Sequence, residues 1–255
     1  MCFKSIGFVG GGRIVRIILE GVKNRNFNLE TISVYDCNKE ALNCISVAFP
    51  KVETVDTLEK LGGRDLIILA IHPPVMMDTL VAIKPLLTEK STILSLVPKI
   101  TIAKMKEKLG GFGRIARCNP NLTSIINKGF NPICFSEELS ENERNAILSL
   151  LDGLGKTPVV KEESLEAYAV ISAMLPTYLW FMWDEICKLG VNFGLGENEV
   201  KDVLKEVVPA AIEVYLKDGM DAYNLIPARP LKDDEESIRN IFETKLKGVY
   251  EKLKN

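Results

Sequence analysis

The stretch that decides the fold is Ile6-Gly7-Phe8-Val9-Gly10-Gly11-Gly12-Arg13-Ile14-Val15. A short apolar run ends in three glycines and leads into residues 13–23, whose apolar side chains have helical spacing. In a G-x-G-x-x-G/A turn, the first glycine makes the tight turn and the second lets the backbone approach a diphosphate. The third position is normally small, and Val15 weakens the match there. The pattern predicts a nucleotide diphosphate at the N-terminus of the first helix.

Strand-like and helix-like segments alternate around this turn through the first 160 residues. The predicted strands are residues 3–9, 31–35, 65–71, 92–97, 114–118, 133–135 and 157–160, and the predicted helices are residues 13–23, 39–49, 75–87, 101–109 and 141–154. Such alternation predicts βαβ units with right-handed crossovers. We therefore expect an α/β fold whose N-terminal domain, residues 1–160, is a doubly wound, mainly parallel Rossmann sheet.

The strand signals stop after Val160. Three long helical patterns follow, at residues 163–189, 197–217 and 233–254, joined by a glycine-rich linker and by a linker that holds two prolines. The sequence therefore predicts a second, all-helical domain over residues 161–255.

Composition excludes several classes of function. The chain has 255 residues and a net charge of −2 with no basic stripe, so a nucleic-acid partner is not expected. The six cysteines are scattered without a C-x-x-C pair, which favours free thiols over a zinc site or disulfides, and we expect no metal. The start of the chain lacks a signal-peptide pattern, so the cytoplasm is the expected location.

An uncharged, aromatic-rich stretch spans residues 167–183. It is shorter than the roughly 20 residues that cross a bilayer and has Pro176 in its middle, so we expect no membrane span. Four of its five aromatic side chains are predicted to serve as core and dimer contacts, in preference to a substrate cage: Tyr178, Trp180, Phe181 and Trp183.

Asp36 stands where the second predicted strand ends. A carboxylate there can accept hydrogen bonds from the adenosine ribose and repels a 2′-phosphate, which by itself favours NAD over NADP. Lys39 and Arg13 are close enough in sequence to complicate that choice, so NAD(P)H is predicted without a preference. The alternative is that Asp36 is only a turn or N-cap residue.

Several segments, in order and spacing, resemble the pyrroline-5-carboxylate reductase family over nearly the whole chain. They are the opening glycine loop, Leu69-Ala70-Ile71-His72-Pro73, Arg117-Cys118-Asn119-Pro120-Asn121, Leu189-Gly190-Val191 and Phe193-Gly194-Leu195. The resemblance implies a homodimer formed through the C-terminal helices. With the glycine motif it gives the predicted cofactor-binding residues: Val9, Gly10, Gly11, Gly12, Arg13, Ile14, Asp36, Ala70, Ile71, His72, Pro73 and Asn121.

The resemblance also implies hydride transfer from a nicotinamide to the C=N carbon of a cyclic imine carboxylate, as in proline biosynthesis. Two substrate loops depart from the family. Ser172-Ala173-Met174-Leu175-Pro176-Thr177-Tyr178 lacks the family's two glycines and second serine, and Ile226-Pro227-Ala228-Arg229-Pro230-Leu231 lacks its glycines and threonine. Backbone amides in glycine loops bind a carboxylate well. This chain therefore needs other donors for a substrate carboxylate.

Ser172, Met174 and Arg229 are the predicted substrate-binding residues. Met174 would fill part of the pocket with an apolar side chain. Arg229 could clamp a carboxylate with paired hydrogen bonds, although a solvated arginine between two prolines is the plainer interpretation.

Ser172, Thr177 and His72 are the predicted catalytic residues. His72, the only histidine, could contact the nicotinamide half or donate a proton, or could merely hydrogen-bond the backbone. The two hydroxyls lie near Pro176, whose missing amide leaves a carbonyl in the preceding turn unpaired. The alternative is that both hydroxyls bond back to that turn.

Two other functions stay open on the sequence. One is a related oxidoreductase that acts on a carbonyl, a hydroxy acid or a deazaflavin. The other is a nucleotide-binding dimer that has lost catalysis, which would bind NAD(H) without oxidising it.

Overall fold

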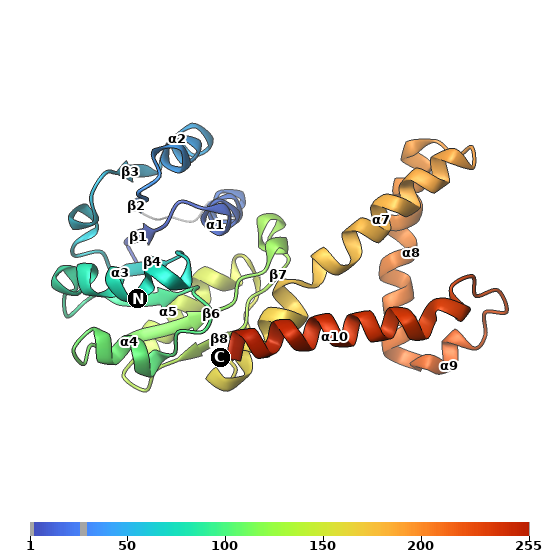
Figure 1. Ribbon diagram of the computed structural model, residues 1–255. Helices are drawn as coiled ribbons and strands as arrows, with labels where there is room; N and C mark the ends of the chain where they lie inside the picture. The colour runs from blue at the N-terminus through green and yellow to red at the C-terminus, as the bar shows by residue number, and fades with distance from the viewer. Residues whose placement is uncertain (1–2, 26–29, 255) are drawn as a thin grey trace. The chain divides into compact units, whose positions relative to one another are not determined.

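The computed structural model describes residues 3–25 and 30–254. A seven-stranded sheet has the order β3-β2-β1-β4-β5-β6-β8, in which every neighbouring pair is parallel except β6 and β8. Its strands are β1 (Ser5–Val9), β2 (Thr31–Tyr35), β3 (Glu53–Val55), β4 (Leu66–Leu69), β5 (Thr92–Ser95), β6 (Ile115–Cys118) and β8 (Ile133–Phe135). This is the predicted doubly wound Rossmann sheet, and Figure 1 shows its strands between helices.

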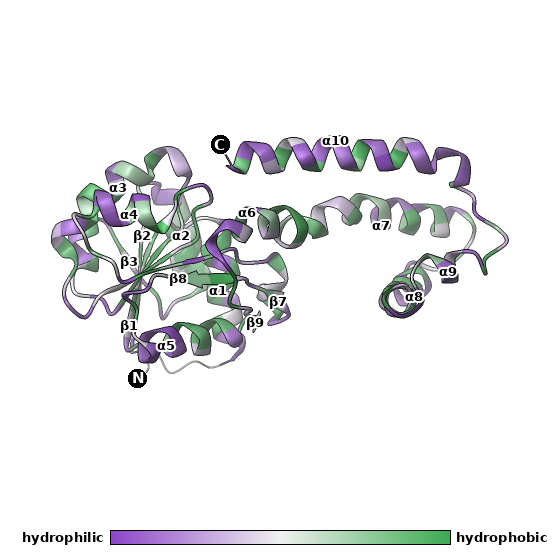
Figure 2. Cartoon of the chain, turned by 90° about the horizontal axis from the view of Figure 1, so that it is seen from below, coloured by the Kyte–Doolittle hydropathy of each residue, from purple (hydrophilic) through white to green (hydrophobic). Residues whose placement is uncertain are grey.

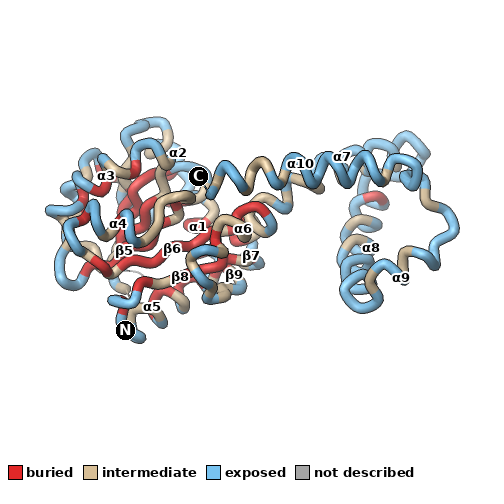
Figure 3. Tube along the Cα trace, turned by 60° about the horizontal axis from the view of Figure 1, so that its bottom comes forward, coloured by how far each residue is buried: buried red, intermediate tan, exposed pale blue. Residues whose placement is uncertain are grey.

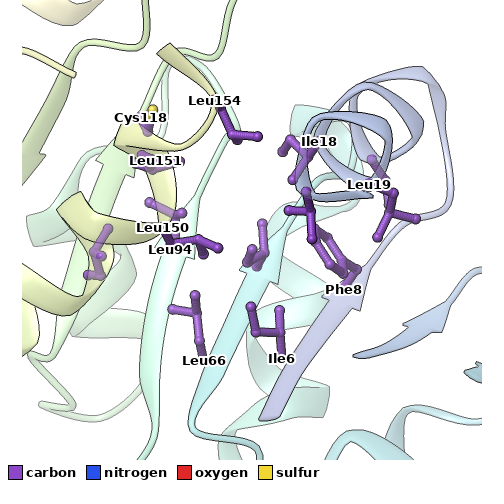
Figure 4. Packing of buried hydrophobic residues seen from close by; sticks show 14 of the residues in the cluster. Ile6, Phe8, Ile18, Leu19, Leu66, Leu94, Cys118, Leu150, Leu151 and Leu154 are labelled. Carbon is purple, nitrogen blue, oxygen red and sulfur yellow. The ribbon is translucent and has the colours of Figure 1, made fainter. Parts of the chain in front are cut away.

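Helices cover both faces of the sheet. They are α1 (Arg13–Asn24), α2 (Lys39–Ala48), α3 (Met76–Ile83), α4 (Ile102–Lys108) and α5 (Glu141–Asp152). The core cluster on one face includes Ile18 from α1 and Leu150 from α5 (Figure 4). Ile45 from α2 belongs to the same cluster. The cluster on the other face includes Leu80 from α3 and Met105 from α4. Strands covered on both faces read as continuous apolar runs, as Leu66–Leu69 does.

The topology sets the position of the ligand crevice. The chain crosses from β1 to β2 on one side and later returns to place β4 on the other side of β1. The order of strands therefore reverses between β1 and β4, and open α/β sheets bind ligands at the carboxyl ends of the strands at such a switch point.

Some predicted elements differ from the structure. The strand expected at residues 157–160 is wrong, because only an isolated bridge joins Val159 to Ile133 there. A small parallel sheet forms just before it, from β7 (Gly129–Phe130) and β9 (Gly155–Lys156). Strand β3 was not predicted, since its three residues carry no apolar run. Short helical turns lie between the longer elements: Leu58–Leu61, Pro73–Val75, Lys84–Leu86, Leu122–Ile126, Glu162–Ser164 and Lys232–Asp234.

The first long C-terminal helix is divided into pieces. Helix α6 (Leu165–Tyr168) runs into a π turn, Ala169–Ala173, and α7 (Leu175–Asn192) follows. The remaining helices are α8 (Glu197–Asp218), α9 (Met220–Tyr223) and α10 (Glu235–Lys254). The chain divides into two compact units, residues 1–173 with 250–255, and residues 174–249. The first unit thus extends past residue 160 through α6 and the π turn.

The helical unit has almost no interior of its own. Among residues 174–249, all of which the structure describes, Val200 alone is buried. Figure 3 shows exposed residues along most of α7, α8 and α10, and Figure 2 shows apolar residues along much of α7. Trp180 and Phe181 are 49% and 67% exposed, so within a single chain they are not core residues.

Candidate functional site

The glycine loop after β1 is held against β4 by close backbone packing. Gly10 has φ of +106°, and a Cβ on it would lie 2.4 Å from the carbonyl oxygen of Ala70. The Gly10 N–H donates to Tyr35 O at 2.7 Å, and the Ala70 N–H donates to Val9 O at 2.9 Å. Glycine is therefore required at this position, because any side chain would collide with the neighbouring strand end.

The third glycine faces open space. Gly12 is the N-cap of α1, and a Cβ on it would meet no atom within 4 Å. No side chain caps α1, and its first turn contains no acidic residue, so the positive end of the helix dipole is not offset by a carboxylate there. Val15 is 0% exposed and belongs to the core, so the sheet accommodates the larger residue at the weak position of the motif. The loop fits a nucleotide diphosphate.

Asp36 ties the end of β2 to the glycine loop. One carboxylate oxygen accepts from the Gly11 N–H at 2.7 Å, and the other accepts from the Asn38 N–H at 2.7 Å. The N-cap of α2 is Asn38, whose side chain accepts from the Glu40 N–H at 2.9 Å. The N-cap interpretation of Asp36 is therefore wrong, although Asp36 does form a turn with Asn38.

The predicted cofactor residues lie at one edge of the sheet. Gly10 follows β1, Asp36 follows β2, and Ala70 follows β4. Asn121 comes three residues after β6. Because these strands are parallel, their carboxyl ends meet at the same edge. The 3₁₀ turn Pro73–Val75 follows this segment, and its N-cap is the exposed His72.

The predicted catalytic hydroxyls bond to the backbone behind them. Ser172 Oγ donates to Tyr168 O at 2.8 Å, and Thr177 Oγ1 donates to Met174 O at 2.6 Å. This is the structural alternative that the sequence left open. Whether either hydroxyl also contacts a substrate stays a prediction. Met174 itself is half-buried.

Arg229 is not a freely solvated arginine. It is half-buried, its guanidinium carbon lies 5.1 Å from the centre of the Tyr223 ring, and its buried Nε has no hydrogen-bond partner among the described residues. Tyr223 in turn donates to Glu235 at 3.1 Å. The guanidinium is therefore fixed by stacking on Tyr223, and its terminal N–H groups are donors that suit a carboxylate.

Asn121 has both ends of its side chain engaged. Its Oδ1 accepts from the Thr123 N–H at 2.8 Å, and its Nδ2 donates to Ser172 O at 2.6 Å. It also caps the helical turn Leu122–Ile126. Its predicted role in binding the cofactor is not visible in these contacts.

Sequence reasoning missed a buried ion triad at the end of β6. Arg117 is 2% exposed, and it donates to Glu162 at 2.8 Å and to Glu166 at 2.7 Å. Burial by itself lowers the pKa of Arg117, but the hydrogen bonds that Arg117 donates to the two carboxylates raise it overall. The signal was present: an arginine inside an apolar strand, and two glutamates four residues apart, which lie on one face of a helix.

The buried thiols are poor nucleophiles. Burial raises the pKa of Cys118 far above its usual range and that of Cys134 to about 12. The reactive thiolate is therefore scarce at either position near neutral pH. Within residues 3–25 and 30–254, no three histidine, cysteine or acidic side chains gather as metal ligands.

The chain is similar to known nicotinamide-dependent oxidoreductases. A family model described as NADP oxidoreductase, coenzyme F420-dependent, matches residues 5–98. A pyrroline-5-carboxylate reductase from Corynebacterium melassecola is 22% identical over 251 residues, which cover 96% of this chain and 93% of the relative. One from Staphylococcus aureus is 24% identical over 204 residues, 79% of this chain and 75% of the relative.

Solved structures share the fold over the full length. Pyrroline carboxylate reductase from Plasmodium falciparum, with NADP bound, superposes with a TM-score of 0.83 at 19% identity and covers 98% of this chain and 97% of that one. The enzyme from Coxiella burnetii has a TM-score of 0.77 at 20% identity, covering 100% and 98%. Prephenate dehydrogenase from A. aeolicus is more distant, at 0.58 and 13% identity over 99% and 94%.

Proposed function

We infer that this chain belongs to the pyrroline-5-carboxylate reductase family, and we propose that it reduces the C=N bond of a small cyclic imine carboxylate with NAD(P)H. One observation carries the proposal: a glycine loop with Gly10 pressed against Ala70 and Gly12 open lies at the β1–β4 switch point. The loop stands in a chain whose relatives of that name match it nearly end to end.

The residues at the carboxyl edge fit the cofactor. The open side of Gly12 and the uncapped start of α1 would hold the diphosphate. Asp36 lies beside them and would face the adenosine ribose. The segment Ala70–Pro73 would lie along the nicotinamide half, where His72 is exposed. When bound, the nicotinamide supplies the hydride.

The chain's own part in the reaction is largely to hold the substrate in place. A protonated imine is already electrophilic, so no strong protein acid is needed. Positioning alone can account for a large share of such a rate enhancement. We propose that Arg229 binds the substrate carboxylate, in place of the glycine-loop amides of the family. Its half-buried guanidinium, held over the Tyr223 ring, supports this assignment through its terminal N–H groups. The proposed roles of Ser172, Thr177 and Met174 in the substrate site rest on the resemblance.

The direct experiment is a steady-state assay of the purified protein. Pyrroline-5-carboxylate is offered with NADH and with NADPH, beside a panel of keto acids, and cofactor oxidation is followed by absorbance. We expect turnover with the imine and none with the keto acids. Turnover of a keto acid without turnover of the imine would instead support the second candidate function described below. Calorimetry with each cofactor at millimolar concentration tests the binding site itself, and no heat with either would overturn the whole assignment.

A second candidate is an oxidoreductase with another small substrate, including a deazaflavin. The altered loop around Arg229 favours it, and so does the match of residues 5–98 to the coenzyme F420-dependent model. A protein that binds NADH but oxidises it with no substrate in either panel would be a catalytically silent nucleotide-binding dimer.

We further propose that the helical unit pairs with a second copy of the chain. With Val200 as the one buried residue in 174–249, a range described in full, the unit leaves large apolar side chains in water on every long helix. These include Phe181 and Ile186 on α7, Val207 and Leu216 on α8, and Ile241 on α10. Exposed apolar area on this scale marks an interface.

The stretch Glu162–Asn192 is, in the described part of the chain, long and apolar enough to cross a membrane by length and composition, with 17% of the window buried. We assign its apolar surface to the dimer. Its first turns support that choice, because Glu162 and Glu166 form ion pairs with the buried Arg117 of the sheet. A cytoplasmic location is proposed with it, since Cys118 and Cys134 are buried free thiols.

A further inference from the structure

The carbonyl oxygen of Ser172 lacks the backbone N–H donor that a continuous helix would supply. Ser172 belongs to the π turn Ala169–Ala173, and Pro176 follows it by four residues. Proline has no N–H, so it cannot donate to the carbonyl four residues before it. The next N–H, that of Thr177, donates instead to Met174 O at 2.9 Å. A part-buried carbonyl in this position needs a donor from another element.

Asn121 supplies that donor. Its Nδ2 lies 2.6 Å from Ser172 O, and the residue is 6% exposed. The amide cannot turn over without loss, because its Oδ1 accepts from the Thr123 N–H at 2.8 Å. The Thr123 hydroxyl lies 2.6 Å from the same oxygen and 2.7 Å from Lys128 O, and its one hydrogen serves one of these two acceptors. A backbone donor on one end of the amide and a carbonyl on the other fix which atom of the amide faces Ser172.

The same strand end holds the earlier turns of this helical segment by other contacts. Asn119 donates its side-chain amide to Leu165 O, and Arg117 pairs with Glu162 and Glu166. Arg117, Asn119 and Asn121 are alternate residues, so an extended chain points them to one side. The bond from Asn121 therefore fixes the last turn of a segment whose first turns are secured separately.

We propose that Asn121 is a positioning residue: its amide takes the place of the N–H that Pro176 lacks, and it fixes the π turn that carries Ser172 at the carboxyl edge of the sheet. The resemblance on its own would make Asn121 a direct cofactor contact. The effect on catalysis rests on the proposed function. The claim that the Asn121 amide replaces the N–H that Pro176 lacks does not.

The test is a double-mutant cycle in the full-length protein. Asn121→Ala removes the donor, and Pro176→Ala restores a backbone N–H that can take its place. With pyrroline-5-carboxylate as substrate, we expect Asn121→Ala to lower kcat by about 10-fold or more, because small displacements in a positioned site are costly. We expect its Kd for NADH to stay within about twofold, because both ends of the amide already bond to protein groups. In the Pro176→Ala background, Asn121→Ala should cost at least about threefold less in kcat.

A second readout does not depend on activity. Asn121→Ala should lower Tm by about 2–4 °C, the shift expected when a chain of this size loses one hydrogen bond of about 1 kcal/mol. In the Pro176→Ala background, Asn121→Ala should lower Tm by less than half of that amount. Thr123→Val is the matched control, because it removes a bond to the other end of the same amide. Its effect on Tm should be equal in the two backgrounds.

Three outcomes overturn the proposal: a Kd for NADH that rises about 10-fold in Asn121→Ala without rescue, equal effects of Asn121→Ala in both backgrounds, or a Thr123→Val effect that Pro176→Ala also suppresses. If the unmodified protein turns over no imine, the proposed function fails, and the Tm cycle still decides the role of Asn121.

Discussion

The backbone N–H of Gly11 donates to the Asp36 carboxylate at 2.7 Å, so the acidic residue at the end of β2 is held against the loop that would bind the diphosphate. A fixed negative charge at this point disfavours a 2′-phosphate on the adenosine ribose. We therefore expect the protein to use NADH with a kcat/KM at least about 10-fold above that for NADPH, the effect of about 1.4 kcal/mol of repulsion.

Asp36→Ser should reverse or abolish this preference, because it removes the charge and leaves space beside the exposed Arg13 and Lys39. The ratio of kcat/KM for the two cofactors is the measurement. Lys39→Ser is the matched control and should move the ratio further towards NADH. A ratio unchanged in Asp36→Ser would place the ribose elsewhere.

The two ends of the glycine loop should respond differently to the same small change. Gly10→Ala places a Cβ 2.4 Å from Ala70 O at a positive φ, so we expect a loss of about 2 kcal/mol or more in the free energy of unfolding. Gly12→Ala adds a methyl group to open space, so Tm should hold while the Kd for NADH rises about 10-fold. Urea denaturation and calorimetry on both variants distinguish the effects. Wild-type NADH affinity in Gly12→Ala would contradict the diphosphate site.

The buried Arg117 should matter for stability through its two partners. Arg117→Met leaves the carboxylates of Glu162 and Glu166 partly buried without their cation, which we expect to cost about 3–5 kcal/mol in urea unfolding. Neutralising both partners as well, with Glu162→Gln and Glu166→Gln, should recover more than half of that loss. A triple variant as unstable as the single one would mean that the packing of the arginine stem, and not its charge, dominates.

Thiol reactivity should follow burial. Cys37 and Cys44 are exposed, and we expect them to react with a small disulfide reagent in the native protein. Cys134, whose pKa burial raises to about 12, stays protonated from pH 7 to pH 9, as does Cys118. Both should react only after unfolding, as mapped by peptide mass spectrometry. Native labelling of Cys134 that increases between pH 7 and pH 9 would contradict this environment.

The proposed dimer predicts a sensitive position on α7. Phe181 is 67% exposed in the single chain, and Phe181→Glu should weaken self-association by about 100-fold or more, because burial of a large apolar side chain contributes roughly 2–3 kcal/mol. Phe181→Leu, the control, should change it little. Sedimentation equilibrium gives both constants. A wild-type protein that stays monomeric at high micromolar concentration would refute the interface.

The sequence predicted the sheet well because its signals are local. Strands such as Leu66–Leu69 are short apolar runs with turn residues on both sides, and the glycine loop marks the first crossover directly. The strand expected at residues 157–160 was wrong because this segment makes only an isolated bridge to Ile133. Pro158 has no N–H with which to extend a ladder.

The candidate site was harder to predict beyond the glycine loop. The contact of Gly11 with Asp36 follows from a known motif, whereas the contact of Asn121 with Ser172 joins residues that are 51 positions apart. The spacing of apolar residues in the sequence does not predict a contact between side chains so far apart. The missing N–H of Pro176 was visible in the sequence, but the side chain that compensates for it was not.

The single buried residue of the helical unit, Val200, also bears on how the protein is made. A chain whose last third gains an interior only from a second copy completes its folding in a bimolecular step. Refolding from urea should then show a slow phase whose rate rises with protein concentration, while the sheet forms first at a rate that does not. Newly synthesised chains would expose an apolar surface to water until they dimerise. The rate of dimerisation would therefore determine what fraction of the chains reaches the native state and what fraction aggregates.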